Sequence, residues 1–208
     1  MGITGNVVIK DGQVINISHI YSLNFRIAKE IIGCSEKILP YILNLNENTI
    51  YNTIILSPPG RGKTTLLRDT IRSISNGLQE YKFAGINVGV VDERAEIAAM
   101  YKGIPQNDLG KRTDILDSIS KDVGMKMLVR SMNPKVVAAD EIGTKEDVDA
   151  INYAVTSGVK GLFTAHGSNL NDIMLNPILN KLYELGIIEK IILIDNNRNT
   201  NLIFDKYK

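Results

Sequence analysis

The residues with the clearest chemical meaning lie in one short segment, residues 57–65, with the sequence SPPGRGKTT. Apolar residues at 53–56 predict a buried strand that runs into this segment, and the pattern of residues 63–76 predicts a helix directly after it. In such an arrangement, backbone N–H groups and the N-terminus of the helix surround a polyanion. Gly60 and Gly62 keep side chains out of the way of the phosphates. The segment therefore predicts a phosphate-binding loop for a nucleoside triphosphate, which we expect to be ATP.

Three side chains of this loop have distinct expected roles. Lys63 can bridge the β- and γ-phosphates, Thr64 can place its hydroxyl on Mg²⁺, and Thr65 can reach the α-phosphate. Ser57 stands where the motif has its first glycine, and its small side chain still suits a turn out of the strand. The alternative, a chance match in an ordinary turn, is disfavoured by the flanking strand and helix. The residues expected to bind the nucleotide are Pro59, Gly60, Arg61, Gly62, Lys63, Thr64 and Thr65.

An acidic pair follows a second predicted strand, residues 136–139. Asp140 is expected to hold Mg²⁺ through water, together with the hydroxyl of Thr64, and Glu141 is expected to polarise the attacking water. Ligands of an open parallel sheet bind at the carboxyl ends of its strands, so this pair would face the phosphate loop. The alternative is a helix-capping pair in front of Ile142.

Three charged residues follow the predicted strand at residues 87–91. Asp92, Glu93 and Arg94 would face the side of the γ-phosphate. Glu93 could assist the attacking water, and Arg94 could contact phosphate or a neighbouring subunit. The alternative is a solvated cluster of ion pairs at the start of a helix.

His166 follows a fourth predicted strand, residues 160–164, and is either a sensor of the γ-phosphate or a structural histidine. Arg112 lies between predicted strands and Arg130 ends a helical stretch. Either arginine could reach across a subunit interface as an arginine finger, although a surface role is the simpler reading. The residues expected to act in catalysis are Glu141, Lys63, Glu93, His166 and Arg94.

The elements that would position these side chains begin near Ile50, where short apolar runs alternate with helical patterns. This alternation predicts an α/β fold, a P-loop core with a mostly parallel sheet flanked by helices. The predicted helices occupy residues 63–76, 96–100, 124–131, 146–156 and 169–185. A closing hairpin is predicted from residues 190–194 and 201–204.

The first part of the chain has a different pattern. Asp11-Gly12 between two apolar runs predicts a hairpin over residues 6–17, and Leu23, Ile27 and Ile31 at helical spacing predict a helix that ends at Gly33. A short helix is predicted over residues 38–45, interrupted at Pro40. We therefore expect two parts. They are an N-terminal hairpin and helices at residues 1–48, which would be a remnant of a preceding domain or a linker, and an ATPase core at residues 49–208.

Composition narrows the class of protein. The chain has 208 residues with a formal net charge of +1 and no tryptophan, so nothing indicates a basic surface for nucleic acid. Cys34 is the single cysteine, which excludes an internal disulfide, and we expect it to be a small packing residue. No apolar run approaches the roughly 20 residues of a membrane span. We expect a cytoplasmic protein.

Several motifs in fixed order give the chain a family resemblance. The segments SPPGRGKTTLLRD, VDERAEI, GIPQNDLGKRTD, AADEIGTKED and TAHGS, with LNFRIAKEIIGC before them, resemble stage III sporulation protein AA, a family of AAA/RecA-like ATPases similar to type II and type IV secretion ATPases. By this resemblance Asp140 and Glu141 would be the Walker B pair, and His166 would match the His box of the secretion ATPases. The segment Asp92, Glu93 and Arg94 would fill the acidic motif of the second strand.

The resemblance implies a biological setting. It implies an ATPase in the cytoplasm of the mother cell, peripherally associated with a membrane channel complex during endospore development, and a ring-shaped homo-oligomer that we expect to be a hexamer. Family members carry a further N-terminal domain, and the opening Met1-Gly2-Ile3-Thr4-Gly5 looks like the interior of the family pattern. We therefore expect that this chain lacks that domain.

Three functions stay open at this point. The first is a motor ATPase that hydrolyses ATP with Mg²⁺ and drives a secretion-like complex. The second is a RecA-like ATPase acting on nucleic acid, for which charge and aromatic content offer little support. The third is a small-molecule kinase, against which Glu141 argues because a glutamate that activates water would waste ATP.

Overall fold

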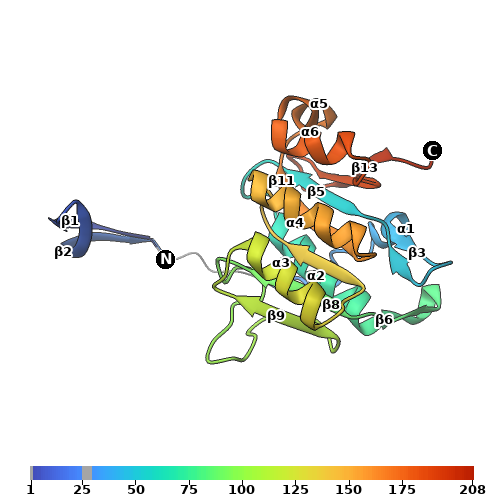
Figure 1. Cartoon of the computed structure of the whole chain (residues 1–208), viewed down its shortest axis with the longest axis horizontal. Coiled ribbons are helices and arrows are strands. Elements are labelled where there is room, and N and C mark those ends of the chain that lie inside the picture. The colour runs from blue at the N-terminus through green and yellow to red at the C-terminus, as the bar shows by residue number, and fades with distance from the viewer. Residues whose placement is uncertain (1, 25–29) are drawn as a thin grey trace.

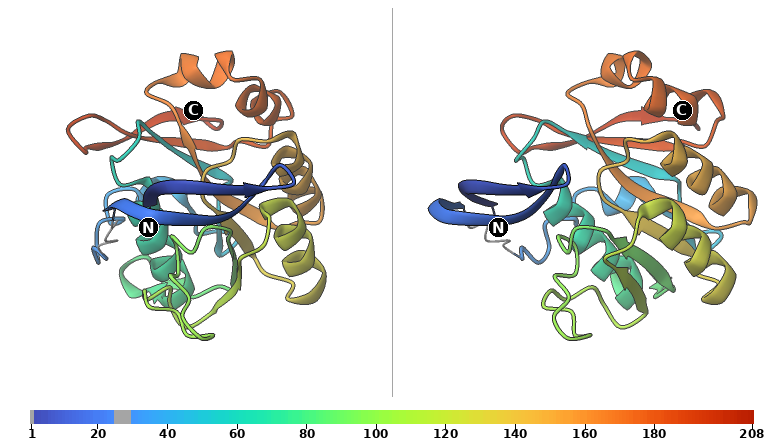
Figure 2. Two further views of the ribbon diagram at one scale, coloured as in Figure 1. Left: turned by 90° about the vertical axis from the view of Figure 1, so that its left-hand side faces the viewer. Right: turned by 60° about the vertical axis from the view of Figure 1, so that its left-hand side comes forward.

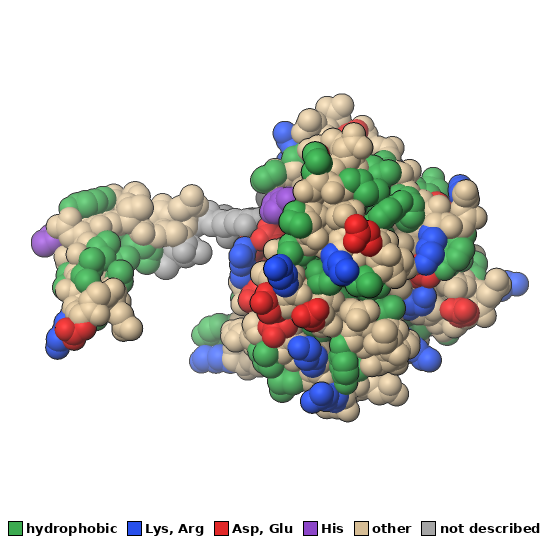
Figure 3. Space-filling model, turned by 45° about the horizontal axis from the view of Figure 1, so that its top comes forward, with side chains coloured by type: hydrophobic (Ala, Val, Ile, Leu, Met, Phe, Trp, Pro, Cys, Tyr) green, Lys and Arg blue, Asp and Glu red, His purple; other side chains and the backbone are tan. Residues whose placement is uncertain are grey.

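The computed structural model describes residues 2–24 and 30–208 of the chain (Figure 1). Strands β1 (Gly2–Lys10) and β2 (Gln13–Asn24) form the predicted N-terminal hairpin. Asp11 and Gly12 connect them with positive φ angles of 52° and 75°, as a tight turn between twisted strands requires. The hairpin lies apart from the main sheet in Figure 1 and comes in front of the core in the left view of Figure 2, and Figure 3 shows hydrophobic side chains along it. It was predicted with shorter arms, because the polar residues beyond Ile17 hide the strand pattern.

The core is a seven-stranded sheet in the order β13-β12-β5-β11-β10-β8-β9. Every neighbouring pair is parallel except β12 and β13, which form the predicted closing hairpin. The predicted mostly parallel sheet is therefore confirmed. The strands are β5 (Thr53–Ser57), β8 (Val88–Asp92), β9 (Thr113–Asp117), β10 (Val136–Ala139), β11 (Lys160–His166), β12 (Lys190–Ile194) and β13 (Thr200–Asp205).

Helices cover both faces of this sheet. Side chains of a strand alternate between faces, so Ile55 of β5 packs in one buried cluster while Ile54 and Leu56 pack in the other. The cluster of Ile55 contains residues of α1 (Leu39–Ile42) and α2 (Lys63–Asn76). The opposite cluster contains residues of α3 (Lys121–Ser131), α4 (Lys145–Thr156), α5 (Leu170–Leu175) and α6 (Pro177–Glu184). Short elements complete the fold: β3 (Leu43–Asn44), β4 (Thr49–Ile50), β6 (Gly77–Leu78), the 3₁₀ helix η1 (Gln79–Tyr81) and β7 (Phe83–Ala84). No helix within the described part of the chain is long and apolar enough to cross a membrane.

The predicted helix at residues 96–100 is wrong, because this segment is an irregular loop. Ala95 and Ala99 have φ angles of 54° and 52°, which an α-helix does not allow. The carboxylate of Asp92 accepts hydrogen bonds from the backbone N–H groups of Glu96, Ile97 and Ala98. These bonds replace the intrahelical ones and fold the loop back on the end of β8.

Prolines and short strands account for the other differences. The predicted helix at 169–185 is two helices, because Asn176 leaves the helical conformation before Pro177 and its side chain caps α6. Pro40 lies in the first turn of α1 and does not interrupt it. The prediction missed the edge strand β9, which has only two strongly apolar residues.

The structure contradicts the predicted helix that ends at Gly33 at two positions, Leu23 and Ile31. Leu23 is in strand β2, and Ile31 has no helical assignment. The remainder of that prediction, residues 25–29 with Ile27, lies outside the described residues.

Candidate active site

The strand order brings the predicted site residues to one edge of the sheet. Strand β11 lies between β5, which leads into the phosphate loop, and β10, which leads into Asp140 and Glu141. The register places His166 of β11 directly opposite Ser57 of β5. The carboxyl ends of parallel strands share one edge, so His166 stands between the phosphate loop and the acidic pair.

The phosphate loop joins β5 to α2 through two left-handed glycines. Gly60 has φ 71° and Gly62, the residue before the first turn of α2, has φ 101°. A Cβ atom added to either glycine would meet nothing within 4 Å, so the backbone conformation is what requires glycine within the protein itself. Ser57 is fully buried, and its hydroxyl donates to the carbonyl of Pro58 at 2.7 Å. Serine therefore fits this position without disturbing the turn.

Thr64 and Asp140 form the candidate metal pair. The Oγ1 atom of Thr64 donates to Oδ2 of Asp140 at 2.5 Å, which joins the start of α2 to the end of β10. A hydroxyl and a carboxylate are oxygen ligands of the kind Mg²⁺ prefers. No group of three His, Cys, Asp or Glu side chains that could hold a metal occurs among the described residues. Mg²⁺ in nucleotide sites uses few protein ligands together with phosphate oxygens, and this donor pair fits that chemistry.

Thr164 is a site residue that sequence reasoning missed. It is fully buried in β11, its hydroxyl donates to Oδ1 of Asp140, and it accepts the backbone N–H of Glu141 at 2.9 Å. The N–H of Glu141 also approaches Oδ1 of Asp140 at 3.1 Å. A threonine two residues before His166, within a buried run of apolar residues, was the available signal. Its position fixes both acidic residues to the neighbouring strand.

Lys63, His166, Glu141 and Arg94 form a chain of polar contacts across the site. Nζ of Lys63, which is 6% exposed, lies 3.1 Å from Nδ1 of His166. Nε2 of His166 lies 3.4 Å from Oε1 of Glu141, and Nη1 of Arg94 lies 2.7 Å from Oε2 of the same carboxylate. Glu141 has φ 53°, an uncommon conformation for a residue other than glycine and one that occurs at functional sites. Four of the five residues expected to act in catalysis thus share one network.

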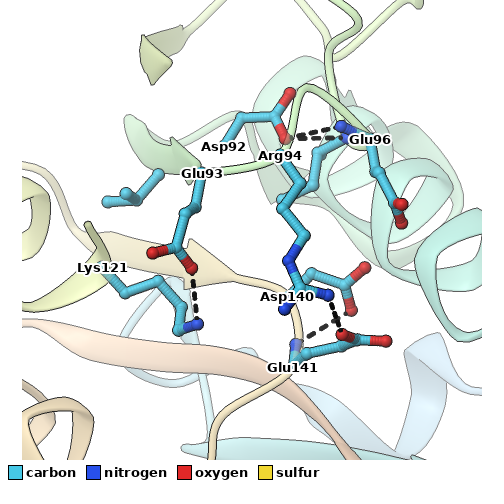
Figure 4. A pocket seen from close by; sticks show the side chains of 9 residues that line it. Asp92, Glu93, Arg94, Glu96, Lys121, Asp140 and Glu141 are labelled. Carbon is cyan, nitrogen blue, oxygen red and sulfur yellow. Dashed lines mark hydrogen bonds and ion pairs between the residues drawn. The ribbon is translucent and has the colours of Figure 1, made fainter. Parts of the chain in front are cut away.

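Glu93 lies in the adjoining pocket (Figure 4), which has an empty volume of about 310 Å³. Arg94, Asp140 and Glu141 line the same pocket, and Glu93 bonds Nζ of Lys121 at 2.9 Å. The predictions did not include Lys121, because it lies outside every motif. Its side chain, 10% exposed, also lies 3.8 Å from the carboxylate of Asp147.

Asp92 lines the same pocket, but its carboxylate binds the backbone of its own chain. It is 2% exposed, and its carboxylate is occupied by the backbone of the following loop. Arg68 of α2 holds the same loop, because its guanidinium donates to the carbonyls of Glu96 and Ile97 at 2.7 and 2.8 Å. Burial lowers the pKa of Arg68. Asp92 and Arg68 therefore position the loop that carries Glu93 and Arg94.

The two other candidate arginines bind their own chain. Arg112 donates to the carbonyl of Ser75 at 3.0 Å, and its backbone N–H donates to the hydroxyl of the same serine. The guanidinium of Arg130 lies 5.7 Å from the ring centre of Tyr153. Neither arginine lines the pocket of Glu93 and Glu141.

Comparisons with known proteins identify a family and a fold. The family model described as "Sporulation stage III, protein AA" matches residues 1–208. The stage III sporulation protein AA of Bacillus subtilis (strain 168) is 43% identical over 184 residues, which are 88% of this chain. The match spans 58% of that relative's length.

Two solved structures share the fold. The ATPase DotB of Legionella pneumophila matches with a TM-score of 0.56 and 16% identity, over 83% of this chain and 49% of that one. The pilus retraction motor PilT with bound ADP matches with a TM-score of 0.52 and 18% identity, over 84% of this chain and 50% of that one. At such identities the likeness concerns the fold alone, and it confirms the expected RecA-like core.

Proposed function

This chain belongs to the sporulation stage III protein AA family, and on that premise we propose that it hydrolyses ATP with Mg²⁺ as a motor of the secretion-ATPase type. In this role it would energise a membrane channel complex during endospore formation. The observation that carries the proposal is the bond between Thr64 and Asp140, with Lys63, His166 and Glu141 beside it. Such a bond brings a phosphate loop and a metal-binding carboxylate within reach of one bound ion.

The roles follow from the positions of the side chains. The phosphate loop and the N-terminus of α2 would hold the triphosphate, with the ammonium of Lys63 against its terminal oxygens. Bound Mg²⁺, held by Thr64 and Asp140, would neutralise phosphate charge. The carboxylate of Glu141 would orient a water and accept its proton. His166 touches both Lys63 and Glu141, so it would report the presence of the terminal phosphate to the base.

Hydrolysis accounts for these residues better than transfer to an acceptor. Glu141 is 34% exposed and lies at a pocket that Glu93 and Lys121 also line. A water reaches such a carboxylate directly. The two solved structures that share this fold, an ATPase and a pilus retraction motor, support the proposal of a motor role.

Assembly and location are part of the proposal. A ring of identical chains, expected to be a hexamer, would act in the cytoplasm at the surface of the membrane channel complex. Arg94 bonds Glu141 of its own chain, and its side chain is 66% exposed. A specific activity that rises with protein concentration would support a site completed by neighbours, and a constant specific activity would contradict it.

Phosphate release from ATP without an added acceptor tests the function. We expect turnover that requires Mg²⁺, stops on chelation, and is lost in Lys63→Ala. Lys37→Ala changes an exposed lysine before the core and is the matched control. Equal turnover in Lys63→Ala and the parent would show that the activity comes from elsewhere.

A further inference from the structure

A second pocket adjoins the phosphate loop and has an empty volume of about 840 Å³. Its described lining comes from three places in the chain, which the fold brings together. The loop contributes Gly60, Arg61 and Gly62, and α2 contributes Thr65 and Leu66. The other walls are Ile31 and Cys34 from the segment before the core, and Ile194, Arg198 and Thr200 from the end of β12 and the start of β13.

Strand order explains why the C-terminal hairpin lies here. Strand β12 runs parallel to β5, with Leu193 opposite Leu56, so Ile194 ends beside the start of the phosphate loop. The segment before the core is fixed independently. The carboxylate of Asp69 in α2 accepts the backbone N–H groups of Gly33 and Ser35 at 3.1 and 2.8 Å. The pocket is therefore formed by anchored segments.

Hydrogen bonds to Asp195 fix the backbone of the turn between β12 and β13, which carries Arg198. The carboxylate of Asp195 accepts the backbone N–H groups of Asn197 and Asn199, both at 2.8 Å. Arg198, between those two residues, takes the left-handed conformation with φ 64°. This places Arg198 at the pocket as a second cationic residue, in addition to Arg61 of the loop, beside the apolar residues Ile31, Leu66 and Ile194.

Thr200 supplies an independent sign of a ligand. Its Oγ1 atom is the one buried side-chain polar atom, among the residues that the structure describes, that has no hydrogen-bond partner. Buried polar groups are almost always paired, and an exception calls for a missing partner. Thr200 lines this pocket, and a change of rotamer about its Cα–Cβ bond moves the hydroxyl to the position that the methyl group occupies.

We propose that this pocket is the nucleoside subsite of the ATP site, an inference that rests on the proposed function. Thr65, expected at the α-phosphate, lines this pocket, whereas Asp140 and Glu141 line the other one. The triphosphate would therefore run from Glu141 toward this pocket and deliver the base and ribose into it. The base packs against Ile31, Leu66 and Ile194, and Arg198 and Thr200 meet its polar edge or the ribose hydroxyls.

Cys34 makes the inference measurable, because it is the single cysteine of the chain and lines this pocket. Burial, with the charge of Asp69 adding to it, raises the pKa of its thiol to about 11. Alkylation is therefore slow at neutral pH and is best followed at about pH 9, where more thiolate is present. The rate of reaction with iodoacetamide, measured by mass spectrometry of the intact chain, reports this pocket alone.

The experiment compares ATP, ADP and inorganic tripolyphosphate, each with Mg²⁺ and at concentrations shown by calorimetry to saturate the protein. We expect ATP and ADP to slow the alkylation of Cys34 at least tenfold and tripolyphosphate to leave it unchanged. ATP binding without protection of Cys34, or equal protection by tripolyphosphate, would overturn this inference alone. Absence of ATP binding would overturn the proposed function and this inference with it.

Substitutions distinguish binding at the nucleoside subsite from binding at the phosphate loop. Thr200→Val and Arg198→Ala are expected to weaken ATP binding about tenfold each and to leave tripolyphosphate binding unchanged, whereas Lys63→Ala weakens both. Asn196→Ala, in the same turn as Arg198, is the control. Unaltered ATP affinity in both subsite variants would overturn the inference.

Discussion

The ammonium of Lys63 lies 3.1 Å from Nδ1 of His166, which joins the phosphate loop to the strand beside it. The other ring nitrogen of His166 faces the carboxylate of Glu141 at 3.4 Å. One imidazole thus touches the residue expected at the terminal phosphate and the residue expected to activate water. In an imidazole ring, the hydrogen bond that one nitrogen makes determines whether the other nitrogen donates or accepts.

His166→Ala should retain nucleotide binding and lower kcat for ATP hydrolysis about 10²-fold, because the link between Lys63 and Glu141 is lost. Steady-state kinetics with a separate binding titration measures the two effects. His19→Ala changes the only other histidine of the chain, on the N-terminal hairpin, and should match the parent. If His166 had only a structural role, His166→Ala would instead lose nucleotide binding and folding together.

Glu141→Gln should bind ATP and hydrolyse it at least about 10²-fold more slowly, because an amide cannot accept the proton of the water. Single-turnover hydrolysis with radiolabelled ATP separates binding from chemistry. Glu146→Gln, an exposed glutamate in the first turn of α4, is the matched control. Turnover equal to the parent in Glu141→Gln would remove this residue from the mechanism.

Thr164→Val should raise the Mg²⁺ concentration needed for half-maximal activity and lower turnover roughly tenfold to a hundredfold. The change keeps the shape of the side chain but removes the hydroxyl that bonds Asp140 and the N–H of Glu141, which leaves buried polar groups unpaired. A titration of activity against Mg²⁺ is the measurement, and Thr156→Val on the exposed face of α4 is the control. An unchanged Mg²⁺ requirement would count against a role for Thr164 at the metal.

Arg94→Ala should lower turnover while nucleotide affinity stays near that of the parent, because Arg94 bonds Glu141 of its own chain at 2.7 Å. We expect that mixing Arg94→Ala chains with Lys63→Ala chains restores no activity, since each chain then lacks a residue of its own site. Lys102→Ala, an exposed cation on the same crossover, is the control. Recovery of activity in the mixture would show that Arg94 acts on a neighbouring chain.

Glu189 predicts a dependence of stability on pH. Burial alone would raise its pKa, but hydrogen bonds from Tyr207, the N–H of Asn52 and Lys160 outweigh it and lower the pKa below 4.5. A lowered folded-state pKa stabilises the fold above the unfolded value and loses that contribution as pH falls through the folded value. Glu189→Gln should therefore cost about 2 kcal/mol of unfolding free energy at pH 7, and the gap to the parent should narrow below pH 4.5.

Urea unfolding followed by circular dichroism at several pH values measures this gap. Glu184→Gln, at the exposed end of α6, is the control and should show no such narrowing. A gap that stays constant between pH 7 and pH 3 would mean that the charge of Glu189 contributes nothing to the fold.

The sequence by itself determined the elements whose patterns are local. The phosphate loop, the buried strands β5, β8, β10 and β11, and helices α2 and α4 follow from apolar runs, helical spacing and glycines within a few residues of one another. The same local order predicted Lys63, Thr64 and Asp140 as residues of one site, because a motif between a strand and a helix needs no distant partner. In the structure Thr64 and Asp140 are in contact. The loop at residues 96–100 was missed because its hydrogen bonds go to the side chain of Asp92.

Only the tertiary structure decided which strand ends meet. Strand β11 lies between β5 and β10, which brings Thr164 to Asp140 across 24 positions of sequence and His166 to Lys63 across 103. Tertiary contacts also direct the carboxylate of Asp92 to the backbone of the loop that follows it, and they pair Arg94 with Glu141. Strand pairing depends on hydrogen bonds and packing between segments far apart in the chain, and no local pattern encodes that order.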